Sequence, residues 1–504
     1  MAGQKLTSKS LSIGQKLFNG GLNSTASPLD LAQNESSSLL NVDFDKFGAV
    51  LKRSGYLNLN TSALNSGATI TGMHWLEASN STKTFLVIAG DKAYSNDLSS
   101  TFTDRTNAMT ITAGNMFKSE TFLDTAMFTN GVDVPIQSTG GNFTAMTVPA
   151  GLTTAKWIKT FNAYTFLANV TDATGYQPSK LYWSNINSIS TWTSTDQAFI
   201  SKNDGQAITG MEVLGDRLVI FKERSIWLGF FTGDADIPFQ FQKSQSHVGC
   251  VSGYSIQKTE NALVFTSDDG VYLFDSNNSY KISDRVTTTY SGYNQSKYSQ
   301  FTSAYKKSKN KYYLSSFSSS SATADGMMTY DNYNNAFSLY SGMAPAYMCM
   351  VYTAGQERLY FGDYSGYIYL ADTGTDDYPL KVQTAINGYY YTKWIDYDDL
   401  VNQKGVPQVD IYYRNANATV TFTYSYDFEE SDTYSLSFST SAGSSVYGSG
   451  VYGTATYAGT GGGHVRKDLT ARGKVVRFGF KNNTLSETMR IDGIGQLVYA
   501  ETNV

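Results

Sequence analysis

The chain has 504 residues, a formal net charge of −5 and 16% charged residues, well below the ~25% of an ordinary globular protein. This charge gives no global basic surface for gripping nucleic acid, and the chain has neither a leading apolar segment nor a run of 18 apolar residues, so we expect no secretory signal and no membrane span. Its 44 Gly and 37 Tyr, with abundant Ser, Thr and Asn, favour strands and turns over long amphipathic helices. We predict a mainly β protein.

Residues 1–65 precede the regular part of the sequence. The segments 19–23 and 27–28 predict an extended arm. This arm packs either against its own chain, which we favour, or on a neighbouring subunit. The stretch 41–56 has strand-like residues on both sides of a Lys46-Phe47-Gly48 turn, so it predicts a hairpin that enters the first of the repeats.

A structural period occupies residues 66–380. The sequence ITGMHWL at 70–76 returns as ITGMEVL at 208–214, and apolar hairpin patterns begin near 70, 116, 157, 208, 254, 301 and 347. Most steps are about 46 residues, the length of a four-stranded β-propeller blade. Third strands are expected at 225–231, 270–275 and 366–370, and fourth strands at 239–242 and 280–282. We predict a six- or seven-bladed β-propeller; a pair of β-sandwiches or an irregular β-solenoid is the alternative.

The period ends near residue 380. Alternating runs at 409–413, 420–426 and 474–480, at irregular spacing, predict a separate antiparallel β-sandwich over 381–504. Within it, loop 441–463 is rich in Gly and Ser and carries Tyr447, Tyr452 and Tyr457. It is either a disordered tip or a partner-binding loop.

The sequence offers no catalytic constellation. Adjacent residues on a strand point to opposite faces, so the carboxylate doublets are expected in turns rather than as a glycosidase pair. The segment 267–272 resembles an Asp-box turn, but its glycine comes one position too early. We therefore name no catalytic, cofactor-binding or metal-binding residue, expect no cofactor, and predict that the protein is not an enzyme. The residues considered are Asp268-Asp269, Asp376-Asp377, Asp398-Asp399, Glu429-Glu430, His74, His247, His464, Cys250 and Cys349.

The N-terminal segment 18–56 carries a series of short motifs. They are Phe18, Gly20-Gly21-Leu22-Asn23, Ser27-Pro28, Asn34-Glu35-Ser36, Asn41-Val42-Asp43-Phe44-Asp45, Gly48-Ala49 and Lys52-Arg53-Ser54-Gly55-Tyr56. Their order resembles the N-terminus of the tail nozzle, or "stabilization", proteins of short-tailed bacteriophages. The central segments 208–227 and 249–275 are similar to the same family, so the resemblance covers the first two-thirds of the chain.

The resemblance implies a structural role in a virion tail. Such a protein, made in the host cytoplasm, forms a homo-oligomeric, hexameric ring below the portal and adaptor and contacts tail fibres. The ring retains the genome and then conducts DNA during ejection without sequence-specific binding. Two other hypotheses stay open: a carbohydrate-binding or glycan-degrading propeller, supported by the aromatic content, and a cytoplasmic scaffold.

Overall fold

The computed structural model describes residues 10–414, 418–431, 433–440 and 462–501. The chain forms two compact units. Unit 1 comprises Met1–Tyr56, Thr329–Gly342 and Asp372–Val504, and unit 2 comprises Leu57–Met328 and Met343–Ala371. Strands β6 (Tyr56–Asn58) and β29 (Gly326–Asp331) run across the boundaries. The described helices are short: α1 (Thr287–Ser291), η1 (Leu64–Gly67), η2 (Lys202–Asp204), η3 (Asp284–Val286), η4 (Gln295–Gln300), η5 (Lys307–Lys309) and η6 (Pro379–Lys381).

Unit 2 contains an antiparallel hairpin at each of the seven positions expected from the period. The alternation of polar and apolar residues therefore located the hairpins correctly. The first strands are β7 (Ile70–Glu77), β11 (Lys118–Phe122), β15 (Thr154–Phe161), β19 (Ile208–Leu214), β23 (Gln257–Lys258), β27 (Ser303–Lys306) and β31 (Tyr347–Thr353). The second strands are β8 (Lys83–Ala89), β12 (Thr125–Thr129), β16 (Tyr164–Asp172), β20 (Arg217–Lys222), β24 (Leu263–Thr266), β28 (Lys311–Ser316) and β32 (Gln356–Gly362).

Third strands follow at the three expected places, and fourth strands at the two expected places. Five sheets lie wholly within unit 2, each with its four strands in chain order. The third strands are β9 (Lys92–Asn96), β13 (Ile136–Ser138), β17 (Gly175–Trp183), β21 (Ile226–Phe231), β25 (Val271–Phe274) and β33 (Ile368–Ala371). The fourth strands are β10 (Thr103–Asp104), β14 (Thr144–Ala145), β18 (Gln197–Phe199), β22 (Phe239–Lys243) and β26 (Ser279–Lys281).

The second strands are buried on both faces. In β8, Phe85 and Val87 belong to one hydrophobic cluster, whereas the alternate residues Leu86 and Ile88 belong to another. Strands β16 and β20 divide their residues between two clusters in the same way. Because successive side chains of a strand point to opposite faces, each of these sheets packs against a different neighbour on each side.

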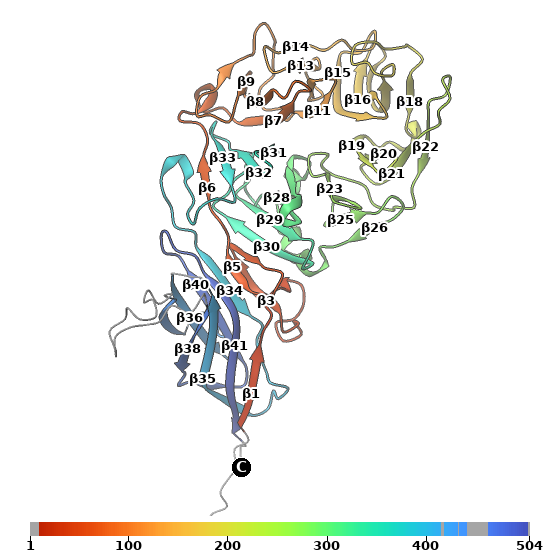
Figure 1. Ribbon diagram of the computed structural model, residues 1–504. Helices are drawn as coiled ribbons and strands as arrows, with labels where there is room; N and C mark the ends of the chain where they lie inside the picture. Colours follow the sequence, from red (N-terminus) through yellow and green to blue (C-terminus); the bar gives the residue numbers. More distant parts are fainter. Residues whose placement is uncertain (1–9, 415–417, 432, 441–461, 502–504) are drawn as a thin grey trace, which may run out of the picture. The chain divides into compact units, whose positions relative to one another are not determined.

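The first strands of unit 2 form a closed circuit. Each contacts the first strand of the next sheet, from β7 through β11, β15, β19, β23 and β27 to β31, and β31 contacts β7. Figure 1 shows the sheets of this unit following one another around a ring. The chain is thus mainly β, with several four-stranded sheets in an arrangement consistent with a β-propeller.

Unit 1 contains two larger sheets. In one, the strand order is β38 (Gly462–Asp468), β35 (Gln403–Arg414), β41 (Arg490–Glu501), β5 (Val50–Lys52) and β4 (Val42–Phe44), while β1 (Ser10–Gln15) pairs with β41 and β39 (Arg472–Gly473) with β35. In the other, the order is β2 (Gly21–Leu22), β3 (Glu35–Leu40), β34 (Gly388–Thr392), β40 (Val476–Asn482), β36 (Ala418–Tyr426) and β37 (Tyr434–Thr440). Strand β30 (Ala336–Ser341) contacts β2, β3 and β4.

The N-terminal segment lies within these sheets of unit 1. The expected hairpin forms as β4 and β5, joined by the predicted turn. However, β5 pairs onward with β41, where Val50 faces Ile491; the expectation that this hairpin enters the repeats was wrong. The predicted arm contributes β2, which runs parallel to β3. The ring of Phe18 packs edge-on against Tyr390 and Phe480, so the arm helps to build the apolar core of its own unit.

The strands expected in the C-terminal region are present as parts of β35, β36 and β40. Loop 441–463 lies outside the described residues except at its end. Among the described residues, no helix is both long and apolar enough to cross a membrane.

Candidate functional site

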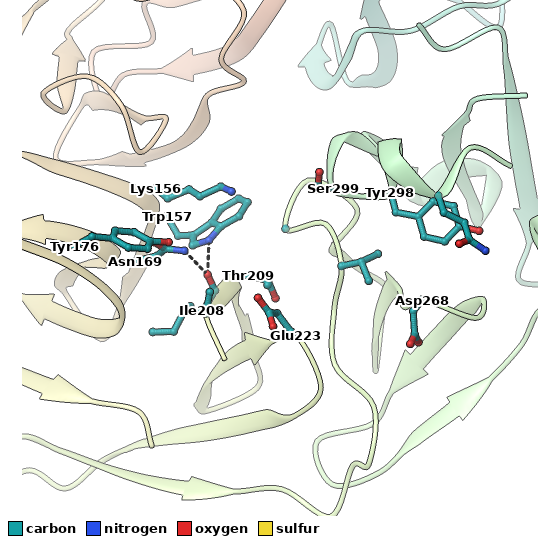
Figure 2. Close-up of a pocket in the computed structure, with 14 residues that line it drawn as sticks. Lys156, Trp157, Asn169, Tyr176, Ile208, Thr209, Glu223, Asp268, Tyr298 and Ser299 are labelled. Carbon is teal, nitrogen blue, oxygen red and sulfur yellow. Dashed lines mark hydrogen bonds between the residues drawn. The ribbon is translucent and has the colours of Figure 1, made fainter. Parts of the chain in front are cut away.

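The interior of the ring in unit 2 carries two adjoining pockets, of about 720 and 410 Å³. Lys156 and Ser299 line both. Three lining residues stand second or third in the first strands of their sheets: Thr71 in β7, Lys156 in β15 and Thr209 in β19. The pockets therefore lie at the N-terminal ends of these first strands. The lining of the larger pocket is drawn in Figure 2.

Trp157 anchors the wall of the larger pocket. Its Nε1 donates to the carbonyl oxygen of Ile208 at 2.9 Å, and Nδ2 of Asn169 donates to the same oxygen at 2.9 Å (Figure 2). Gly253 lies against this wall: a Cβ there would stand 2.2 Å from the Thr209 carbonyl oxygen and 2.5 Å from the indole Cη2 of Trp157. Glycine is therefore required at position 253 by close packing.

A layer of aromatic side chains crosses the ring beside the pockets. The ring of Tyr254 lies 5.1 Å from that of Trp157 and 6.4 Å from that of Tyr347. The Tyr254 hydroxyl donates to the Met116 carbonyl oxygen and the Tyr347 hydroxyl to that of Phe117, both at 2.7 Å. Burial raises the pKa of both tyrosines, so they stay neutral donors. These bonds connect the sheets that begin with β23 and β31 to the one that begins with β11.

A charged layer lies further along the same strands. Nζ of Lys159 is 2.8 Å from Oε1 of Glu212 and 3.0 Å from Oε2 of Glu120, and the three side chains are 14 to 19% exposed. Burial by itself lowers the pKa of Lys159, but Glu212 and Glu120 together raise it above its ordinary value. Lys159 is therefore charged, and it connects three consecutive sheets through strands β11, β15 and β19.

The two carboxylates of this layer differ. Burial raises the pKa of Glu212, but Lys159 and Lys118 outweigh it and hold that pKa below its usual range. For Glu120, burial and the nearby Glu212 outweigh Lys159, so its pKa is raised. Burial also lowers the pKa of Lys118. Glu212 is thus the permanent anion of the layer, and Glu120 is the group that protonates first.

His74 completes the charged layer. Its Nδ1 lies 2.9 Å from Oγ of Ser119 and its Nε2 2.5 Å from Oγ1 of Thr121. Burial, with Lys159 nearby, lowers its pKa to about 4. At neutral pH the imidazole is uncharged, and it accepts a hydrogen bond from one hydroxyl and donates to the other.

The sequence singled out several other polar residues, and the structure places them apart. The four carboxylate doublets lie outside the strands, as expected. Asp268 lines the larger pocket, whereas Asp269 pairs with Lys281 at 3.0 Å. His464 stacks on Tyr412 in unit 1, far along the chain from His74. Both cysteines are free thiols. Within the described ranges, no group of three or more His, Cys, Asp or Glu could hold a metal ion.

Sequence reasoning missed Lys159, Lys156, Glu120 and Glu212. One signal was available: His74 and Glu212 occupy the same place in the repeated segments ITGMHWL and ITGMEVL, and both belong to the charged layer. The lysines carry no such mark, because a lone lysine in a strand is usually a solvated residue.

A second cluster, the Arg53 hub, holds the N-terminal motif in unit 1. The Arg53 guanidinium bonds both carboxylate oxygens of Asp377, at 2.8 and 2.6 Å, and donates to Oδ1 of Asn41 and the Ser341 carbonyl oxygen. The side chains of Arg53 and Asp377 are only 1% and 7% exposed. Burial, opposed by Arg53, raises the pKa of Asp377.

The remaining residues around the hub have equally specific positions. Nδ2 of Asn41 donates to the Asn387 carbonyl oxygen at 2.9 Å, and the Tyr56 hydroxyl donates to that of Gly342 at 2.9 Å. A Cβ on Gly55 would stand 1.7 Å from the carbonyl oxygen of Asp376. The N-terminal motif thus fixes three separate segments of unit 1 to one another.

Comparisons with known proteins do not identify a family for the chain. No protein-family model matches the chain, and no curated protein matches it. Among solved structures, the chain is similar to one described as "Streptogramin B lyase structure", with 12% sequence identity, a TM-score of 0.42, and coverage of 63% of this chain and 97% of that one.

Proposed function

We propose that this protein is a structural component of a short-tailed phage tail. In this proposal unit 2 is a seven-bladed β-propeller and unit 1 is a β-sandwich. The protein assembles into a hexameric ring below the portal and adaptor. The ring contacts tail fibres, retains the genome, and conducts DNA during ejection. The protein is located in the virion and has no catalytic role.

The observation that carries the proposal is the Arg53 hub. The series of motifs that resembles tail nozzle proteins runs from Phe18 to Tyr56, and Arg53 within it pairs with Asp377. Most residues of these motifs are buried in unit 1, and we interpret them as the residues that build this unit. The proposal assigns unit 1 to contacts with neighbouring tail proteins.

The contacts inside unit 2 bear on where DNA passes in this proposal. The tyrosine hydrogen bonds and the Lys159 ion pairs cross the inside of the ring. We therefore assign the DNA passage to the space between subunits rather than to the axis of each propeller. Because phosphates should slide past such a passage, we expect its wall to carry more Asp and Glu than Lys and Arg.

Electron microscopy of the purified full chain, and of phage particles made with and without it, tests this proposal. We expect a six-fold ring with a central hole, and tailless or DNA-leaking particles when the protein is absent. Complete particles without the protein would contradict a tail role. A ring whose central wall is basic would contradict only the proposed passage of DNA.

A further inference from the structure

The repeated segments of the ring place two threonines at equivalent positions. Thr71 and Thr209 each follow the isoleucine of an Ile-Thr-Gly-Met segment. Both hydroxyls are buried, and neither has a hydrogen-bond partner in the described part of the chain. Thr71 is only 2% exposed. Because a buried hydroxyl without a partner is costly, its retention at two matching positions points to an external partner.

Each of these threonines lines one of the two pockets. Thr71 lines the smaller pocket and Thr209 the larger one. Both pocket volumes are within the range of roughly 300–1,000 Å³ that is common for small-molecule sites. Both threonines are thus part of the walls of spaces large enough for a ligand.

Lys156 supplies a cation where the pockets adjoin. It is half-buried, and the described residues show no ion pair to its ammonium group. Its Nζ lies 5.4 Å from the ring of Trp157. Burial lowers the pKa of Lys156, which reflects the cost of holding this charge without a carboxylate.

The other lining residues favour the smaller pocket, rather than the larger one, as the place from which an anion reaches Lys156. The smaller pocket has hydroxyl and amide groups around it, such as those of Asn115, Gln300 and Thr323, and no carboxylate lines it. The larger pocket includes Glu223 and Asp268, and Tyr176, which is 63% exposed, lies among its lining residues. An acidic group is thus attracted to Lys156 from the smaller pocket, whereas the larger pocket suits neutral hydroxyls.

We propose that the two pockets bind an acidic saccharide, with its carboxylate at Lys156 and its hydroxyls at Thr71 and Thr209, whose side chains rotate about χ1 to bring their covered hydroxyls into the pockets. A sugar ring carries many hydroxyls that both donate and accept hydrogen bonds, as the two orphan threonine hydroxyls require. Tyr176 offers an exposed aromatic face to a further sugar unit. This site does not depend on the role of the protein in a tail.

Titration of the full-length protein with three probes tests the chemistry of the site. The probes are glucuronic acid, glucose and inorganic phosphate at one ionic strength, and binding is followed by calorimetry. We expect glucuronic acid to bind at least roughly tenfold more tightly than glucose or phosphate, because only it presents both a charge and ring hydroxyls. Equal binding of phosphate, equal binding of glucose, or no binding of glucuronic acid would each overturn the proposal.

Substitutions then test the residues. We expect Lys156→Met to weaken glucuronic acid binding at least roughly tenfold and Lys156→Arg to restore most of it. Thr71→Val should weaken binding several-fold without lowering the melting temperature, since the lost hydroxyl has no partner in the protein.

Thr165→Val is the matched control for this change. The Thr165 hydroxyl is also buried and without a partner, but Thr165 lines neither pocket. This variant should bind glucuronic acid as the wild type does. Equal losses in Thr71→Val and Thr165→Val, or unchanged binding in Thr71→Val and Lys156→Met, would overturn the assignment of the site.

Discussion

Each of the two units contains a charged cluster, but the two clusters are built in opposite ways. In unit 1, the Arg53 hub joins residues 324 positions apart and is almost completely buried. In unit 2, Lys159 reaches Glu120, only 39 positions away, and the cluster keeps 14 to 19% of its side-chain exposure. The ring is closed by many similar steps, most of them between sheets that are near one another in sequence, whereas several strand pairs of unit 1 join segments that are far apart in the chain.

This difference predicts which cluster matters more for stability. Removing one partner of a buried ion pair leaves an uncompensated charge and is strongly destabilising, and the effect weakens as the pair gains access to water. The hub should therefore be the more sensitive of the two. The predictions below are ordered by the size of the expected effect.

Arg53→Met should destabilise unit 1 by about 3–5 kcal/mol. The substitution leaves the carboxylate of Asp377 buried and removes the hydrogen bonds to Asn41 and Ser341. Hydrogen exchange should show faster opening of β4, β5 and β34, with little change in β8 and β20. Faster exchange throughout the ring of unit 2 would show that the two units do not unfold separately.

The double variant Arg53→Met with Asp377→Leu is the control for that prediction. Replacing both partners removes the uncompensated charge, so part of the lost stability should return. A double variant as unstable as the sum of the two single variants would mean that the pair is not coupled, and the hub would then owe its importance to packing alone.

Lys159→Met should destabilise unit 2 by about 3 kcal/mol at pH 8. The loss should shrink toward pH 5, because without Lys159 burial and mutual repulsion raise the pKa values of Glu120 and Glu212 above those in the wild type. The folded variant then binds more protons than the unfolded chain, so its stability relative to wild type falls as pH rises. Chemical denaturation at pH 5 and pH 8 measures this, and an equal loss at both pH values would contradict the assigned ion pairs.

The contrast between the units also explains what could be predicted from sequence. The seven hairpins of unit 2 were located because alternation within a strand and a step of about 46 residues are visible locally. In unit 1 the strands themselves were predicted, but the pairing of Val50 with Ile491 and of Arg53 with Asp377 was not. Contacts between segments that far apart leave no periodic trace in a single sequence.

The candidate site was predictable only in part, for a related reason. His74 and Glu212 share one place in a repeated heptapeptide, so comparing repeats position by position reveals a polar residue that faces the ring interior. Lys156 and Lys159 lie outside the two repeated heptapeptides, and nothing in the sequence distinguishes them from solvated surface lysines. Their importance comes from burial, which only the packed structure shows.

His74 should make unit 2 sensitive to acid. Its pKa in the folded protein is about 4, below its ordinary value near 6.5, so between these values the unfolded chain binds more protons and stability falls as pH falls. Between pH 7 and pH 5 the imidazole should contribute a loss of about 2 kcal/mol. His74→Gln should remove this loss while Lys159, Lys118, Glu120 and Glu212 are kept. An unchanged pH profile in this variant would mean that His74 is protonated in the folded state as easily as in the unfolded chain.

The smallest effect should come from one matched pair of hydroxyl groups. Tyr254 donates to Met116 in unit 2 and Tyr56 donates to Gly342 in unit 1, and substitution by phenylalanine removes the hydroxyl that makes this hydrogen bond. Each change should cost about 1 kcal/mol. If unit 1 is the less redundant structure, Tyr56→Phe should also accelerate hydrogen exchange across all of β5 and β34, whereas Tyr254→Phe should affect only the ends of β11 and β23. A ring held by many equivalent contacts should confine the effect of losing one of them to its neighbourhood. If the two substitutions accelerate exchange over equally wide regions, the closed ring is no more redundant than the hub.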